Sequence, residues 1–309
     1  MFNIKKDRSK TDQNGNEPGL SNQPAHSKTP IPWKVYLLLV GLGIVGSLGI
    51  LPYVRTLYGS AIAAQQVSIR SFYVVSFIQG LIMSSLLSLL GLVLASRTGL
   101  GVPRFVGLVQ KDFPRKAGAD VQAAGPSFYV NNRPVSVLSR KARLLQNVGL
   151  PVLVGLLIGA VLLLLDRLVF ASAIEAASVA GGGGIAETTW WQGILASFYG
   201  GIVEEILLRL FTLNLIVWLI MLLLGRERRK PGLFEIWTAI IISSVVFALG
   251  HLATGSAVTE MSLLFGVRII LLNSIAGVTL GYLFVRRGLL TAMTAHFTAD
   301  IVIHVLTAI

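Results

Sequence analysis

The chain has no cysteine among its 309 residues. This absence excludes disulfide bonds, a thiolate nucleophile and zinc held by cysteine. Charged residues are also scarce, at 13% of the chain, whereas a soluble domain has about 25%. Hydrophobic residues make up 54%, and the mean hydropathy is +0.74. The composition is that of an integral membrane protein, in which a charged side chain inside an apolar run needs its own explanation.

Negative charge is scarcer than positive charge, and the formal net charge is +12. The basic residues cluster in segments that flank the apolar runs, at 97–147, 226–230 and 286–287. Clusters of this kind are typical of the loops that set membrane topology, and no folded basic domain for nucleic acid is visible. We therefore expect the lipid bilayer and no nucleic acid as a partner. The expected location is the bacterial cell membrane, with the N-terminus in the cytoplasm and the C-terminus outside.

Several apolar runs are long enough to cross a bilayer, which takes about 20 residues. A membrane-spanning backbone must satisfy its own hydrogen bonds, so each run is expected to be a helix. The predicted fold is all-α, a polytopic membrane bundle of about seven or eight transmembrane helices. The candidate spans are Trp33–Val54, Ser71–Ala95, Val148–Phe170, Trp190–Leu224, Phe234–Leu252, Leu263–Val285 and Leu289–Ile309.

The run Trp190–Leu224 is too long for one straight crossing, because a helix of that length spans roughly 50 Å against a ~30 Å hydrocarbon core. It is expected either to tilt strongly and leave the membrane or to break near Gly200-Gly201. Three regions follow from the whole pattern. Residues 1–32 form a disordered cytoplasmic tail. Residues 33–170 hold the N-terminal spans and a cytoplasmic loop, 97–147, with a small hairpin around Asn131-Asn132. Residues 190–309 form a C-terminal membrane core.

Two adjacent glutamates, Glu204 and Glu205, lie inside the longest apolar run, and Arg209 follows them. Ionised groups at membrane depth cost several kcal/mol each, so they persist where they face a protein interior or a wet cavity. Glu205 and Arg209 are four residues apart and can pair on one helix face. Glu204 is rotated about 100° away and is free to project into a cavity as a general base. The alternative is a buried charge cluster that fixes helix packing.

Two later spans carry histidines. His251 shares a helix face with Phe247, and a lone membrane histidine is often an interhelical hydrogen bonder. His296, Asp300 and His304 recur at intervals of four residues, so a carboxyl group can hold His296 in one tautomer. His304 is expected to have a surface or packing role. Polar groups are costly in an apolar chain, and their convergence on one wet site would explain why they are present. Carboxylates and histidines around a water molecule are suited to peptide hydrolysis.

The ordered motifs Glu-Glu-x-x-x-Arg, Phe-x-x-x-His and His-x-x-x-Asp resemble the CPBP family of intramembrane proteases. That family includes the type II CAAX prenyl endopeptidases and bacterial bacteriocin-processing and lysostaphin-resistance-like immunity homologues. The resemblance covers about Gln192 to Ile309, and it makes 190–309 a catalytic core acting on a membrane-associated protein or peptide.

The same resemblance assigns roles to individual residues. It implies that Glu204 is the catalytic glutamate, that His251 orients and activates the water, and that His296 stabilises the oxyanion. Asp300 falls where the prenyl endopeptidases have asparagine, so Asp300 is either protonated, an orienter of His296 or a metal ligand. Glu204, His251 and His296 would fit zinc; a metal-free, glutamate-dependent hydrolysis is slightly favoured.

Two further functions are compatible with the same residues. Acidic and histidine side chains in spans can form the relay of a proton-coupled transporter, although the N-terminal half has no matching acidic cluster. A catalytically idle immunity or scaffold protein is the other alternative, and the intact motif set argues against it.

Overall fold

The computed structural model describes residues 32–64, 66–101, 145–171, 188–226, 230–256 and 261–306. These residues are helical between short connections, and none of them forms a strand, which confirms the all-α prediction. The predicted tail and the hairpin around Asn131-Asn132 lie outside the described residues, as does most of the predicted loop 97–147.

The N-terminal half contributes three helices and then a fourth after the undescribed segment. Single π-helical segments flank that fourth helix. The elements are α1 (Trp33–Gly49), α2 (Leu51–Ala64), α3 (Ile69–Thr98), η3 (Leu145–Gly149), α6 (Leu150–Leu165) and η4 (Asp166–Phe170).

The C-terminal half begins with one long helix built from four consecutive elements and continues with three more helices. The four elements are α8 (Trp190–Phe198), η5 (Tyr199–Glu204), η6 (Ile206–Leu213) and α9 (Asn214–Leu223). The rest are α10 (Leu233–Ser256), α11 (Leu263–Arg287), α12 (Leu289–Asp300) and η7 (Ile301–Val305).

Local sequence signals explain where several of these helices begin and end. The Ser68 hydroxyl accepts a hydrogen bond from the Ser71 amide (3.0 Å) at the start of α3, and Ser262 caps α11 in the same way. Gly99 follows α3 with φ +74°, and Gly288 follows α11 with φ +90°. These backbone angles favour glycine, so the chain can leave each helix sharply there.

Six helices among the described residues are long and apolar enough to cross a membrane, and they identify an integral membrane protein. They match the first six predicted spans to within a few residues, and the last apolar helix, Leu289–Val305, is shorter. The six are Trp33–Gly59, Ile69–Thr98, Asn147–Phe170, Trp190–Leu223, Leu233–Ser256 and Leu263–Arg287.

The helix Trp190–Leu223, here called the central helix, runs unbroken for 34 residues. The break expected near Gly200-Gly201 is absent, so that alternative is wrong. The chain stays helical there and widens into π-helical turns at Tyr199–Glu204 and Ile206–Leu213, on either side of Glu205. Such turns are rare and occur often at functional sites. The two glycines pack tightly against α12 instead of exposing their backbone, which removes the reason for a break.

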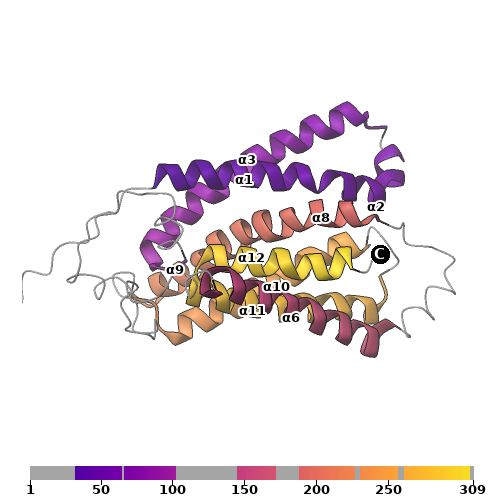
Figure 1. Ribbon diagram of the computed structural model, residues 1–309. Coiled ribbons are helices and arrows are strands. Elements are labelled where there is room, and N and C mark those ends of the chain that lie inside the picture. The colour runs from indigo at the N-terminus through magenta and orange to yellow at the C-terminus, as the bar shows by residue number, and fades with distance from the viewer. Residues whose placement is uncertain are drawn as a thin grey trace, which may run out of the picture. The chain divides into compact units, whose positions relative to one another are not determined.

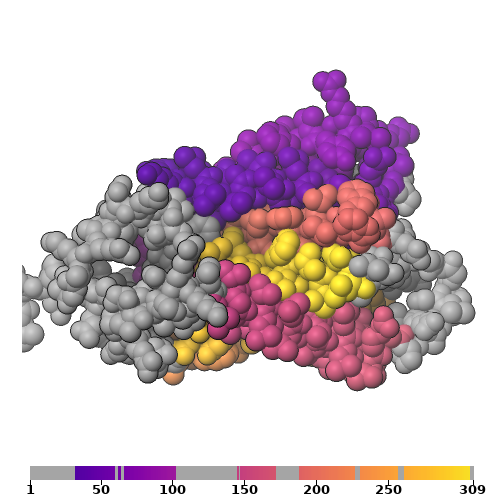
Figure 2. Space-filling view, viewed as in Figure 1, coloured from indigo at the N-terminus to yellow at the C-terminus, as the bar shows by residue number. Residues whose placement is uncertain are grey.

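The central helix is the hub of the bundle, since α1, α3, α10 and α12 all contact it. In Figure 1, α1 and α3 lie side by side over one flank of the bundle, and they contact each other extensively. Figure 2 shows α12 in yellow between α8 and α6 on one face. The buried apolar residues form two clusters along this hub. Both include residues of α10, α11 and α12, and the first adds α1 and α3 whereas the second adds α6.

Small residues allow α6 to approach the back of α12. A side chain added at Gly155 would overlap the carbonyl oxygen of Ala295, and one at Gly159 would come within 2.6 Å of Val302 Cβ. Close backbone approach of this kind is typical of helix pairs in membranes. The N-terminal half therefore supports the helix that carries His296.

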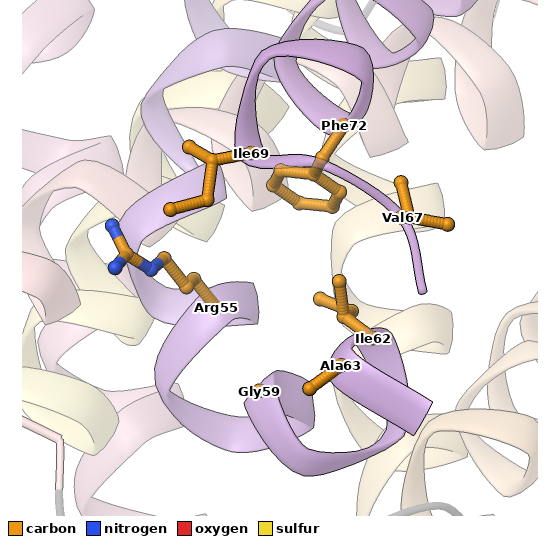
Figure 3. Close-up of a pocket in the computed structure, with 7 residues that line it drawn as sticks. All are labelled: Arg55, Gly59, Ile62, Ala63, Val67, Ile69 and Phe72. Carbon is orange, nitrogen blue, oxygen red and sulfur yellow. The ribbon is translucent and has the colours of Figure 1, made fainter. Parts of the chain in front are cut away.

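A pocket of about 210 Å³ lies between α2 and the beginning of α3 (Figure 3). None of the predicted site residues lines it. Its lining residues are Arg55, Gly59, Ile62, Ala63, Val67, Ile69 and Phe72.

Candidate active site

Glu205 and Arg209 form an ion pair inside the bundle, as their spacing predicts. Arg209 Nη1 lies 3.1 Å from Glu205 Oε1, and both side chains are almost completely buried. Arg209 also donates from Nη2 to the carbonyl oxygen of Gly277 on α11 (3.2 Å). Its guanidinium carbon lies 5.2 Å from the ring centre of Phe247 on α10. One arginine thus links the central helix to both neighbouring helices and places Glu205 between them.

His296 on α12 is bound to the same carboxylate. Its Nδ1 lies 2.8 Å from Glu205 Oε1, and the residue is 5% exposed. An ionised carboxylate only accepts hydrogen bonds, so Nδ1 is the donor in this pair. The sequence predicts that a carboxyl group fixes the ring of His296, with Asp300 as the candidate from its spacing. The structure gives that position to Glu205.

The other ring nitrogen of His296 points toward two carboxylates. Nε2 lies 3.7 Å from Glu204 Oε2 and 3.6 Å from Asp300 Oδ1. Both separations are too long for a hydrogen bond. The side chains of Glu204 and Asp300 are 19% and 13% exposed, whereas Glu205 is fully enclosed. Of the paired glutamates, Glu204 therefore faces the accessible side of His296.

Gly200 makes room for this arrangement. A Cβ atom at position 200 would overlap Oδ2 of Asp300 and lie 3.3 Å from Nε2 of His296. The next residue, Gly201, packs in the same way against Phe297, where a Cβ would lie 2.7 Å from the Cβ of that residue. The two glycines allow the central helix and α12 to approach closely at the level of the carboxylates.

His251 on α10 is linked to the cluster by Phe247, whose ring contacts both His251 and His296. The rings of Phe247 and His296 are 5.7 Å apart in an edge arrangement, and those of Phe247 and His251 are 4.6 Å apart. Nδ1 of His251 lies 2.9 Å from the Phe247 carbonyl oxygen, which can only accept, so Nδ1 donates there and Nε2 remains free in the neutral ring. Within the described residues, His251 makes no hydrogen bond or ion pair with Glu204.

The arrangement joins the three predicted motifs on the central helix, α10 and α12, in a chain that also has the sequence signature of a known family. Residues 186–302 match the family model of type II CAAX prenyl endopeptidase Rce1-like proteins. The recognition of the CPBP group is thereby confirmed for this region. No curated protein and no solved structure matches the chain.

The Rce1-like region includes all six predicted site residues and runs from just before α8 into η7. The matched family is one of endopeptidases. The helices α1, α2, α3 and α6 lie outside the matched region, although all four pack directly on the central helix or on α12.

His304 lies two residues beyond the Rce1-like region, in the π-helical segment η7 that follows α12. Its Nδ1 is 3.5 Å from the hydroxyl oxygen of Tyr53 on α2, and the two rings meet edge to face at 5.7 Å. It is partly buried and has a packing contact, in agreement with the role expected for it.

Among the residues that the structure describes, no group of three or more His, Asp or Glu side chains is arranged to hold a metal ion. Glu204, His251 and His296, the set that the resemblance offers for zinc, therefore do not fit a metal site in this arrangement. The ring of Phe247 contacts both histidine rings edge-on.

Sequence reasoning missed two residues that shape the site. From the sequence, Gly200 marks a candidate break in the helix and Asn214 has no assigned role. Asn214 is fully buried and donates from Nδ2 to the carbonyl oxygens of Arg209 (3.4 Å) and Leu210 (2.9 Å). An amide in the middle of an apolar run is the signal that could have drawn attention to it.

Proposed function

We propose that the protein is an intramembrane endopeptidase that hydrolyses a peptide bond in a membrane-associated protein or peptide. One observation carries the proposal. His296 is held by buried Glu205 through Nδ1 and presents Nε2 to Glu204 and Asp300, inside helices that can span a membrane. The match of this region to a protease family supports the same reaction.

Water activation is assigned to Glu204. Its carboxylate is partly exposed and is not used by Arg209, so it is free to accept a proton from a water molecule. His251 has a free Nε2 because its Nδ1 bonds to its own helix, and that nitrogen can accept a hydrogen bond that orients the water. The hydroxide oxygen then attacks the carbonyl carbon of the scissile bond.

Oxyanion stabilisation is assigned to Nε2 of His296. With Nδ1 donating to Glu205, Nε2 can donate only from a protonated ring, whose positive charge offsets one of the carboxylates around it. Arg209 offsets Glu205 and holds it in place for His296. Asp300 orients the ring from the other side, 3.6 Å from Nε2.

Glu204 both takes up and releases the proton that is transferred in the reaction. The tetrahedral intermediate collapses when the carbon–nitrogen bond breaks and the carbonyl double bond forms again. The proton that Glu204 took from the water passes to the leaving amine, so the carboxylate is ready for another cycle. No step is assigned to a metal ion.

Cleavage by the purified protein tests the proposal. The full chain in lipid vesicles is incubated with a membrane-protein extract and a peptide library, and products are identified by mass spectrometry. Glu204→Gln and His251→Ala should abolish product formation, while Asp166→Asn, a carboxylate change on η4 away from the site, should not. Undiminished cleavage by Glu204→Gln would refute the assignment.

A further inference from the structure

The last turn of α3 touches both helices that carry the site. Thr98, the final residue of α3, is 3% exposed, and its hydroxyl donates a hydrogen bond to Oδ1 of Asn214 on the central helix. Both residues are buried, so their polar groups depend on protein partners for their hydrogen bonds. The contact joins residues 116 positions apart.

The side chain of Asn214 also forms hydrogen bonds with the π-helical segment that precedes it. Its Nδ2 group donates to the carbonyl oxygens of Arg209 and Leu210, which lie five and four residues earlier. The π-helical register of Ile206–Leu213 shifts the backbone hydrogen bonds, and the amide of Asn214 satisfies carbonyls within it. The backbone of Arg209 is thereby held from α3, while its side chain holds Glu205.

The residues that follow α3 contact the beginning of α12. The carbonyl oxygen of Gly101 accepts a hydrogen bond from the amide of Leu289 (3.0 Å), the first residue of α12. Gly101 has φ +87°, and a side chain there would overlap the ring of Phe284 on α11. The turn is therefore fitted closely against the junction between α11 and α12.

These contacts close a ring. From Thr98 it runs through Asn214, Arg209 and Glu205 to His296, and it returns along α12 to Leu289 and Gly101. The bond between Glu205 and His296 is 2.8 Å long, and it lies on the side of the ring opposite to the α3 turn. A change in the spacing of the two helices at the α3 turn therefore alters the site.

We propose that Thr98 and Asn214 are positioning residues, and that the turn Thr98–Gly101 sets the relative placement of Glu205 and His296. The assignment of a catalytic effect rests on the proposed function. The effect on the hydrogen bond of His296 does not rest on the proposed function, because it follows from the contacts alone. A 1 Å misplacement of reacting groups can cost about 100-fold in rate. Removal of the contacts that the turn makes should therefore lower kcat more than it changes KM.

The first test removes the Thr98 hydroxyl. Thr98→Val keeps the shape and deletes the donor, Thr98→Ser restores the donor, and Thr291→Val is the matched control. Thr291 is also buried, and among the described residues its hydroxyl donates to the carbonyl oxygen of Arg287, four residues earlier. In Thr98→Val we expect kcat to fall about tenfold or more with KM nearly unchanged, and Thr98→Ser to recover most of it. Thr291→Val should behave as the parent.

An independent readout uses the chain's four histidines. In protein labelled with ¹⁵N-histidine, the Nδ1 proton of His296 is assigned by its disappearance in His296→Gln. We expect that resonance to shift or broaden in Thr98→Val and to stay in place in Thr98→Ser and Thr291→Val. This signal tests the positioning role even where the parent cleaves no substrate, which would refute the proposed function alone.

A second test of the turn uses its two glycines, which differ in the space available for a side chain. Gly99 and Gly101 both have positive φ, so alanine strains the backbone at either position. A Cβ at Gly99 meets nothing within 4 Å, whereas one at Gly101 overlaps Phe284. Gly101→Ala should therefore move the His296 resonance and lower kcat, and Gly99→Ala should change only the thermal stability.

The outcomes separate cleanly. Reduced kcat and a shifted His296 resonance in Thr98→Val and Gly101→Ala, with normal controls, support the proposal. An unmoved resonance in both variants overturns it. A lower unfolding temperature with parental kcat and an unmoved resonance also overturns it, since the turn would then stabilise the fold without positioning the site.

Discussion

Nδ1 of His296 lies 2.8 Å from Oε1 of Glu205, a contact that joins α12 to the central helix across 91 positions of sequence. It gives the two adjacent glutamates different surroundings. Glu205 is shared between His296 and Arg209 and is fully enclosed, while Glu204 is partly exposed. The two residues should therefore respond differently to the same substitution.

Glu205→Gln should destabilise the protein. The change leaves the buried guanidinium of Arg209 without its charged partner, and breaking a buried pair from one side costs about 3–5 kcal/mol. Denaturant unfolding of the purified protein in detergent measures the loss. Combining it with Arg209→Met should recover part of the stability, because the unpaired charge is then removed as well.

Glu204→Gln should leave stability close to that of the parent while removing peptide cleavage. Its carboxylate makes no hydrogen bond or ion pair within 3.5 Å among the described residues, so little native structure depends on its charge. Unfolding and cleavage are measured on the same preparation. A destabilisation as large as that of Glu205→Gln would show that the distinction between the two glutamates is mistaken.

Gly200→Ala should reduce cleavage severely, because the new methyl group would occupy the space of Asp300 Oδ2 and separate α12 from the central helix. Gly41→Ala on α1 is the control, since a Cβ there meets nothing within 4 Å. In a helix that control should be neutral or stabilising by about 0.5–1 kcal/mol. Initial rates and unfolding temperatures of both variants provide the comparison, and equal rates would contradict the tight fit at Gly200.

Asp300→Asn should retain cleavage, whereas Asp300→Leu should lose it. The amide keeps an oxygen beside Nε2 of His296 and can also donate to the oxyanion, as the asparagine of the prenyl endopeptidases would at this position. Leucine offers neither group. Steady-state rates with one identified substrate decide the matter. Equal loss in both variants would mean that the ionised carboxylate itself is required.

Asp166→Asn should affect stability and not the rate of cleavage. Asp166 on η4 accepts two hydrogen bonds from Arg268 on α11, at Nε and Nη2, which ties the ends of these two helices together. The pair is partly exposed, so about 1 kcal/mol is expected. A double-mutant cycle with Arg268→Gln isolates the coupling, and a coupling indistinguishable from zero would contradict this prediction.

The parts of the structure that follow from local spacing could be predicted. The spans follow from hydropathy, and the ion pair of Glu205 with Arg209 follows from a separation of four residues on a helix. The expected break at Gly200-Gly201 was wrong for a tertiary reason. Glycine pairs often mark helix ends, but here α12 covers them and their lack of side chains is used for close packing.

The partner of His296 could not be predicted from spacing. Asp300 is its neighbour on the same helix, yet the shortest contact is with Glu205 on another helix. Periodicity predicts the face of a helix on which a residue lies. It does not predict at which residue another helix crosses that face. The same limit applies to His251, whose path to the cluster runs through the ring of Phe247.

Composition and hydropathy are enough to predict that this chain is a helical membrane protein, where its spans lie and which charged residues are too costly to be incidental. Composition and period are sufficient for that, because the bilayer leaves few choices to a backbone. The packing of the helices, by contrast, brings Glu205 to His296, leaves Glu204 partly exposed beside it, and places the turn Thr98–Gly101 in contact with the central helix and α12. Those outcomes depend on how side chains of distant helices meet, and close packing permits only one such arrangement.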